Sequence, residues 1–94
     1  MFYVYILRSL LNNRYYVGCT ADLESRLAKH NQGYVQSTKA YRPWEMIYHE
    51  SYGTLKEARR RERELKSWKS RKRIETLINK AKLILAPSSS GLGQ

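Results

Sequence analysis

The stretch FYVYILRSLLNNRYYVGCT, residues 2–20, contains two runs of aromatic and β-branched residues separated by a short polar segment. Residues 2–8 and 14–19 have the composition of β-strands, and residues 11–13 supply a turn, so the stretch predicts a β-hairpin. Successive side chains of a strand alternate between its two faces. A connection with an even number of residues would place Tyr5 on the same face as Tyr16 and Gly18, whereas an odd number would separate them.

The other elements are predicted by capping residues and by apolar periodicity. Asp22 is a good N-cap for a helix that runs to about residue 32, and Gly33 stands where a left-handed C-terminal residue is favoured. We expect a third strand at 44–51, a helix at 54–68 and another from residue 70. The order β, β, α, β, α, α predicts an α+β domain over residues 1–85, with a small three-stranded antiparallel or mixed sheet flanked by helices. Residues 86–94 are predicted to be a disordered tail.

The charge of the chain indicates the class of partner. Its 94 residues include 18 Lys and Arg against 8 Asp and Glu, a formal net charge of +10, which favours a nucleic acid. A membrane partner is not expected because the sequence has no long apolar run, and the absence of a signal-peptide pattern predicts a cytoplasmic protein. The single cysteine, Cys19, allows no internal disulfide, so we expect it to pack in the core.

Two helices carry polar residues at positions that should face inward. In the helix at 22–32, Arg26 and His30 lie one turn apart along the edge of the Leu23–Leu27 stripe. In the helix at 54–68, Glu62 falls within the apolar stripe, about 160° from Glu64. A carboxylate in that position needs a partner. It can form an ion pair with Lys66 or Arg59, or it can bind a metal such as magnesium, which one carboxylate and a substrate phosphate can hold.

A basic cluster surrounds Trp68 and is the predicted nucleic-acid contact. If Ser70 caps the last helix, Arg71, Lys72 and Arg73 occupy its first turn, where the helix dipole disfavours positive charge. A bound phosphate would offset this unfavourable interaction. A solvated helix end is the alternative. No base-reading module is recognisable, so contacts should be mainly to the backbone. The predicted binding residues are Lys66, Lys69, Arg71, Lys72 and Arg73.

Several short motifs resemble the GIY-YIG endonuclease family. The first family motif corresponds to YVY at residues 3–5 and the second to YVG at residues 16–18. Arg26 matches the family's arginine, and Glu62 in EARRRERELK matches its metal-binding glutamate. The resemblance extends over about residues 2–78. It implies a small single-domain member of the family.

This resemblance implies hydrolysis of DNA phosphodiester bonds with one divalent metal ion, Mg²⁺ or Mn²⁺. If the family's residue roles apply to the matching positions here, Glu62 binds the metal and Arg26 stabilises the charge that builds on the phosphate. Tyr16 or Tyr5 then deprotonates or orients the attacking water. His30 would contact the phosphate or the leaving group. Branched or damaged DNA is the candidate substrate, RNA is left open, and a protein partner could supply the target.

The chain also departs from the family pattern. Tyr3 and Val4 replace the Gly-Ile of the first motif, and Cys19 stands where some members have a lysine. Asn79 is only a loose candidate for the polar residue that assists the site in some members. These departures keep a second hypothesis open, namely a module that binds nucleic acid on the same fold without cutting it.

Overall fold

The computed structural model describes the backbone of residues 1–85 and the side chains of residues 1–82. Its elements, in chain order, are β1 (Phe2–Ser9), β2 (Tyr15–Thr20), α1 (Leu23–Gln32), the short 3-10 helix η1 (Lys39–Tyr41), β3 (Trp44–Tyr52), α2 (Leu55–Ser67) and α3 (Arg71–Leu85). The predicted α+β class and element order are confirmed. The expected tail, residues 86–94, lies outside the described residues.

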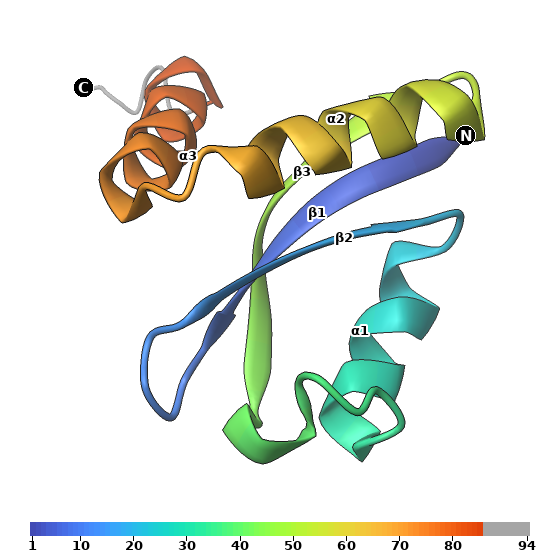
Figure 1. Ribbon diagram of the computed structural model, residues 1–94, viewed down its shortest axis with the longest axis vertical. Helices are drawn as coiled ribbons and strands as arrows, with labels where there is room; N and C mark the ends of the chain where they lie inside the picture. Colours follow the sequence, from blue (N-terminus) through green and yellow to red (C-terminus); the bar gives the residue numbers. More distant parts are fainter. Residues whose placement is uncertain (86–94) are drawn as a thin grey trace.

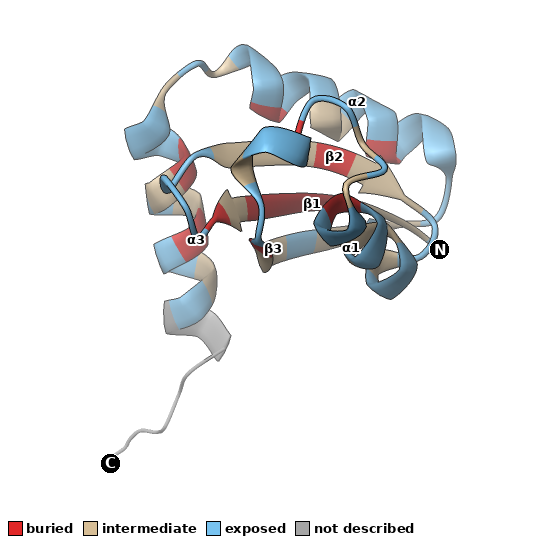
Figure 2. Ribbon diagram, turned by 90° about the horizontal axis from the view of Figure 1, so that it is seen from below, coloured by how far each residue is buried: buried red, intermediate tan, exposed pale blue. Residues whose placement is uncertain are grey.

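The sheet has β1 in its centre, with β2 and β3 on either side (Figure 1). Both neighbours run antiparallel to β1, so the sheet is antiparallel throughout, and the direction of the third strand, which the sequence left open, is established. Residues 4–7 of β1 have no exposed surface, and this strand forms the buried centre of the molecule in Figure 2.

The register of the hairpin decides which side chains share a face. Tyr5 pairs with Gly18 and Leu7 pairs with Tyr16. Directly paired residues of an antiparallel ladder project to the same side. Tyr5, Tyr16 and Gly18 therefore lie on one face of the sheet, which is the first of the two arrangements that the sequence allowed.

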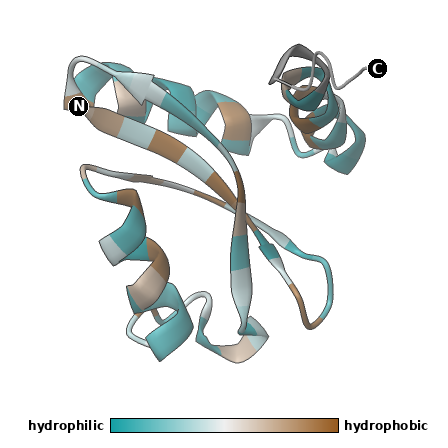
Figure 3. Ribbon diagram, turned by 180° about the vertical axis from the view of Figure 1, so that it is seen from behind, coloured by the Kyte–Doolittle hydropathy of each residue, from teal (hydrophilic) through white to brown (hydrophobic). Residues whose placement is uncertain are grey.

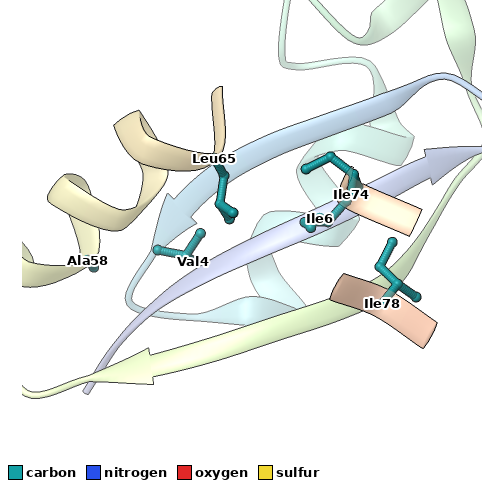
Figure 4. Packing of buried hydrophobic residues seen from close by; sticks show 6 residues of the cluster. All are labelled: Val4, Ile6, Ala58, Leu65, Ile74 and Ile78. Carbon is teal, nitrogen blue, oxygen red and sulfur yellow. The ribbon is translucent and has the colours of Figure 1, made fainter. Parts of the chain in front are cut away.

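Helices α2 and α3 cover the opposite face. Val4 and Ile6 are fully buried there against Ala58 and Leu65 of α2 and against Ile74 and Ile78 of α3 (Figure 4). Each fully buried aliphatic side chain contributes about 1.5–3 kcal/mol by leaving water. In Figure 3 hydrophobic residues lie along β1 and on parts of the helices, whereas much of α2 is hydrophilic. This core fixes α2 across the sheet.

Helix α1 covers the face that carries Tyr5. Its Leu23 and Leu27 pack with Tyr5, Leu7 and Trp44 in a second, smaller core. The predicted cap of α1 is present, since the Asp22 side chain accepts a hydrogen bond from the Ser25 N–H at 3.1 Å. Gly33 ends the helix with φ of 86°, a conformation that side-chain-bearing residues rarely adopt.

Helix α2 begins at the capping residue Thr54, whose hydroxyl oxygen accepts a hydrogen bond from the Glu57 N–H at 3.2 Å. The cap sets where α2 starts and, with the core contacts, which of its residues reach the edge of the sheet. Within residues 1–85, no helix is both long and apolar enough to cross a membrane.

Candidate active site

A pocket of about 380 Å³ lies at the edge of the sheet formed by β2, where α1 and α2 approach from opposite faces. Its lining brings together residues of four elements: Tyr5 of β1, Tyr16 and Gly18 of β2, Arg26 of α1 and Glu62 of α2. Four of the five predicted catalytic residues are therefore neighbours. His30 is the exception, because it does not line the pocket.

The phenol of Tyr5 lies directly against Gly18 on the neighbouring strand. A Cβ atom added to Gly18 would come within 2.5 Å of Tyr5 Cζ, far inside van der Waals contact. Any larger residue would displace the phenol. Glycine at this position thus allows Tyr5 to place its hydroxyl at the floor of the pocket.

His30 lies behind Tyr5 and has no exposed surface. The Tyr5 hydroxyl and His30 Nε2 are 2.9 Å apart, and His30 Nδ1 is 2.7 Å from Thr38 Oγ1. Because the Thr38 hydroxyl donates to the Val35 carbonyl at 3.3 Å, its oxygen accepts from Nδ1–H, and Nε2 accepts from Tyr5. The predicted contact of His30 with phosphate does not agree with this buried position.

Burial keeps both members of the Tyr5–His30 pair neutral. It raises the pKa of Tyr5 to about 12, and the nearby Arg26 guanidinium opposes the rise without reversing it. Burial, assisted by Arg26, lowers the pKa of His30 to about 4. At neutral pH the proton therefore stays on Tyr5, and His30 acts as a hydrogen-bond acceptor.

Arg26 reaches the pocket from α1, one helical turn before His30, as the helix period predicts. Its Nε is buried and has no hydrogen-bond partner among the described side chains and backbone. A buried donor without a partner is uncommon in folded proteins. Arg26 lines the pocket and forms no salt bridge with any described residue, so its guanidinium can bind an anion there.

Glu62 reaches the pocket from the opposite side. Its side chain is 20% exposed, and Oε2 accepts a hydrogen bond from Lys66 Nζ at 2.8 Å. By contrast, the Glu64 side chain is 55% exposed and pairs with Arg61 at 3.1 Å. The helix period thus separates the two glutamates as predicted, and the ion pair with Lys66 that the sequence allowed is present.

The pocket carries an excess of positive charge. Besides Arg26 and Lys66, it is lined by Arg59 and Arg63 of α2, and among the residues that the structure describes Glu62 is the one carboxylate in its lining. No group of three or more His, Cys, Asp or Glu residues that could hold a metal occurs in the described part of the chain. A cation in this pocket would therefore need oxygen ligands from a bound substrate as well as from Glu62.

The predicted basic cluster is divided between two surfaces. Lys66, Lys69 and Arg71 line an open pocket along β2. Lys72 and Arg73 line a different hollow together with Trp68, and the Arg73 guanidinium lies 4.2 Å from the centre of the Trp68 ring. Neighbours in the sequence thus face different sides of α3.

Five further residues complete the comparison with the sequence. Cys19 packs against the core as expected but also lines the pocket, where burial raises the pKa of its thiol. Asn79 lines another pocket beside Glu45 and Glu75, so the structure does not bring it to the site. Thr38 was missed, because an isolated threonine in an irregular segment has no recognisable pattern. Arg59, which the sequence offered as a partner for Glu62, does line the pocket, whereas Arg63 was missed because it follows Glu62 directly and has no helical spacing that places the two on one face.

Comparisons with known proteins identify the family and agree with the fold. The family model described as the GIY-YIG catalytic domain matches residues 1–75. A UPF0213 protein of Bacillus pumilus is 39% identical over 72 residues, covering 76% of this chain and 72% of that protein. A UPF0213 protein of Staphylococcus haemolyticus is 36% identical over 76 residues, covering 80% of this chain and 92% of that protein. The solution NMR structure of a UPF0213 protein from Bacillus halodurans is similar over 84% of each chain, with a TM-score of 0.53 and 32% sequence identity.

Proposed function

We propose that this chain, which belongs to the GIY-YIG catalytic-domain family, is a nuclease that hydrolyses DNA phosphodiester bonds with a divalent metal ion. One observation carries this proposal. Tyr5, Tyr16, Arg26 and Glu62 come from four separate elements and line a single pocket. Packing alone gives no reason for an arginine with an unpartnered Nε and a carboxylate to meet beside two phenols.

The pocket suits a phosphodiester because of its charges. Arg26 can donate to two phosphoryl oxygens at once, a geometry that lysine cannot reproduce. Arg59, Arg63 and Lys66 add positive charge on the α2 side. Together these side chains would bind the phosphate and stabilise the negative charge that develops during hydrolysis.

Two phenols can orient or deprotonate the attacking water. Tyr16 lines the pocket from the edge strand, and Tyr5 lies at its floor with its hydroxyl donating to His30. When the water oxygen bonds to phosphorus, the P–O bond to the leaving oxygen breaks, the water proton passes to a phenol oxygen, and the leaving oxygen takes up a proton from solvent. Tyr5 can accept it as its own proton moves to His30 Nε2, so His30 serves the reaction through Tyr5 rather than by touching phosphate.

The donor set fits a magnesium or manganese ion. Glu62 would hold it, because a hard cation of this kind is often bound by one carboxylate together with substrate phosphate oxygens and water. When bound, the metal would supply positive charge against the phosphoryl oxygens. The Lys66 ammonium now occupies Oε2 of Glu62 and would have to share or leave that oxygen.

The same ion pair supports a second candidate function. Lys66 Nζ lies 2.8 Å from Glu62 Oε2. If this ion pair persists when nucleic acid binds, Glu62 has only a structural role, and the pocket is a cationic phosphate-binding site. The protein would then be a nucleic-acid-binding module that cuts nothing. The two candidates differ in one measurable property, metal-dependent cleavage.

A nicking assay tests the proposal. Linear, forked and single-stranded DNA, with an RNA oligonucleotide as a further substrate, are incubated with the protein with and without Mg²⁺ or Mn²⁺. The proposal expects cleavage of at least one DNA substrate that requires the metal and stops with chelator. Tight binding to all of them without any cleavage would support the binding module instead.

A further inference from the structure

A second open pocket adjoins the candidate active site along β2. Its volume is about 490 Å³, and Tyr16 and Lys66 belong to the lining of both pockets. Further along, the lining is completed by residues of three segments, namely the hairpin, the α2–α3 connection and the start of α3. We call this surface the β2 groove and define it by Arg14, Tyr15, Tyr16, Lys66, Lys69 and Arg71.

The β2 groove is cationic along its whole length. It contains Arg14, Lys66, Lys69 and Arg71, and none of the described residues in its lining is an aspartate or glutamate. Arg14 and Lys69 are exposed, and neither forms a salt bridge within residues 1–82. The Arg14 guanidinium lies 4.6 Å from the centre of the Tyr41 ring, a contact that leaves its charge without a carboxylate partner. The charges of Arg14 and Lys69 can therefore attract an anion more strongly than a cation already paired with a carboxylate.

Arg71 gives the groove a rigid wall. Its Nη1 donates to the Asn13 carbonyl at 2.7 Å, its Nε donates to Glu75 at 3.2 Å, and its guanidinium lies 4.2 Å from the centre of the Tyr15 ring. These contacts join the start of α3 to the hairpin. Arg71 is thus held in place before any ligand binds, which lowers the entropy lost when it contacts an anion.

The other half of the basic cluster faces a different surface. Lys72 and Lys80 line the hollow beside Trp68, and both are exposed. They carry the same charge as Arg14 and Lys69 and belong to the same small domain. The chain therefore contains its own matched control for the location of binding.

We propose that the β2 groove binds the phosphates next to the one that enters the Glu62 pocket, so that a nucleic-acid strand runs along β2 past Tyr16 toward Arg14 and Lys69. This inference rests on the proposed function and deepens it, because it assigns the track of the strand to one side of the site. Arg14, which the sequence did not suggest, becomes a substrate-binding residue, and Lys72 and Arg73 do not contact that strand.

The test compares two double variants of the full chain, Arg14→Ala with Lys69→Ala and Lys72→Ala with Lys80→Ala. Each removes two positive charges. Binding of fluorescein-labelled DNA is measured by anisotropy in EDTA, between about 50 and 200 mM salt, so that no cleavage interferes. The groove variant should lose about tenfold or more in affinity, and its log–log salt slope should fall in magnitude by about two, while the control variant stays close to wild type.

The possible outcomes separate this inference from the nuclease proposal. Equally weakened DNA binding in both variants would indicate a diffuse electrostatic contact and would overturn the proposal that the β2 groove binds the strand. Unchanged DNA binding by the groove variant would also overturn it, and is the result expected if the groove binds an acidic protein instead. Metal-dependent cleavage by the wild type would persist as evidence for the nuclease in either case. If only the groove variant loses DNA affinity and the wild type cleaves no DNA, the groove proposal is supported and the nuclease proposal is refuted.

Discussion

At the residue scale, Arg26 is the side chain whose chemistry is least replaceable. Its Nε is buried without a partner, and it approaches the pocket opposite Glu62. Replacement by lysine keeps the charge but removes the two-pronged geometry. We predict that Arg26→Lys lowers the single-turnover nicking rate by about a hundredfold or more while DNA binding changes little.

Arg63→Lys is the matched control, because Arg63 lines the same pocket but is exposed. Its nicking rate should remain near that of wild type. Wild-type turnover by Arg26→Lys would remove Arg26 from the chemistry, whereas equal losses in both variants would indicate that only general pocket electrostatics matter.

His30 and Thr38 define a second residue-scale feature, the orientation of the Tyr5 phenol. With Thr38 accepting from Nδ1, Nε2 of His30 is left without a proton and accepts from Tyr5. We predict that ¹⁵N NMR shows the Nδ1–H tautomer and that the imidazole remains neutral from pH 7 to about 5, because burial lowers its pKa to about 4. An Nε2–H tautomer, or a titration near the ordinary value of about 6.5, would contradict this.

Thr38→Val tests whether the hydroxyl sets that tautomer. Valine has nearly the same shape, and the backbone of residue 38 is held by the Trp44 indole N–H, which donates to its carbonyl at 2.9 Å. We predict a mixture of His30 tautomers and a nicking rate about tenfold lower, with both restored in Thr38→Ser. A tautomer unchanged in Thr38→Val would mean that the surrounding packing, not the hydroxyl, fixes the ring.

At the element scale, the position of α2 depends on one carboxylate of β3. Arg61 donates to both oxygens of Glu50, from Nε at 2.9 Å and from Nη2 at 3.0 Å, and the hydroxyls of Tyr48 and Tyr52 donate to the same carboxylate. Arg61 precedes Glu62 in the chain. The network therefore fixes the rotation of α2 that turns Glu62 toward the pocket.

We predict that Glu50→Gln lowers the free energy of unfolding by about 1–3 kcal/mol, since a partly buried Arg61 loses the carboxylate that accepts two of its hydrogen bonds and keeps only its pair with the exposed Glu64. Urea unfolding at pH 7 measures this. Glu45→Gln on the same strand is the control, because the Arg8–Glu45 pair is about 40% exposed and should contribute about 1 kcal/mol or less. Equal effects of the two changes would contradict a special role for the network.

The same carboxylate predicts how stability depends on pH. Burial alone would raise the pKa of Glu50, but hydrogen bonds from Arg61, Tyr48 and Tyr52 outweigh it and hold that pKa below its usual range. A carboxyl with a lowered folded-state pKa stabilises the protein fully above the unfolded value of about 4.3 and loses this contribution as the pH falls through the folded value. The stability difference between wild type and Glu50→Gln should therefore shrink as the pH falls below about 4. A difference that stayed constant down to pH 3 would contradict the assignment.

At the scale of the whole molecule, the elements were predictable because each has a local signal. The aromatic and β-branched runs gave the hairpin, Asp22 and Thr54 gave the helix starts, and the helix period gave the distinct position of Glu62. The strand order, the shared face of Tyr5 and Tyr16, and the antiparallel third strand depend on pairing between distant segments, which single-sequence patterns do not reveal.

The same limit explains the parts of the site that the sequence missed. Burial of His30 behind Tyr5 requires Thr38, eight residues further along in an irregular segment, to close over it. Division of the basic cluster requires the direction of α3 relative to α2. Both are tertiary effects, whereas the chemistry of the pocket follows from side-chain types that the motifs identify.

The most direct test of the account compares Glu62→Gln with Glu64→Gln, two neighbouring glutamates of α2 on different sides of the helix. Nicking of DNA in Mg²⁺, DNA binding and melting temperature are measured on both variants. We predict that Glu62→Gln abolishes metal-dependent nicking while binding persists or strengthens, because one negative charge beside the phosphate is removed, and that Glu64→Gln behaves like wild type. If Glu62→Gln melts at a lower temperature but still cuts DNA with magnesium, its ion pair with Lys66 is its whole role, and the catalytic account is contradicted.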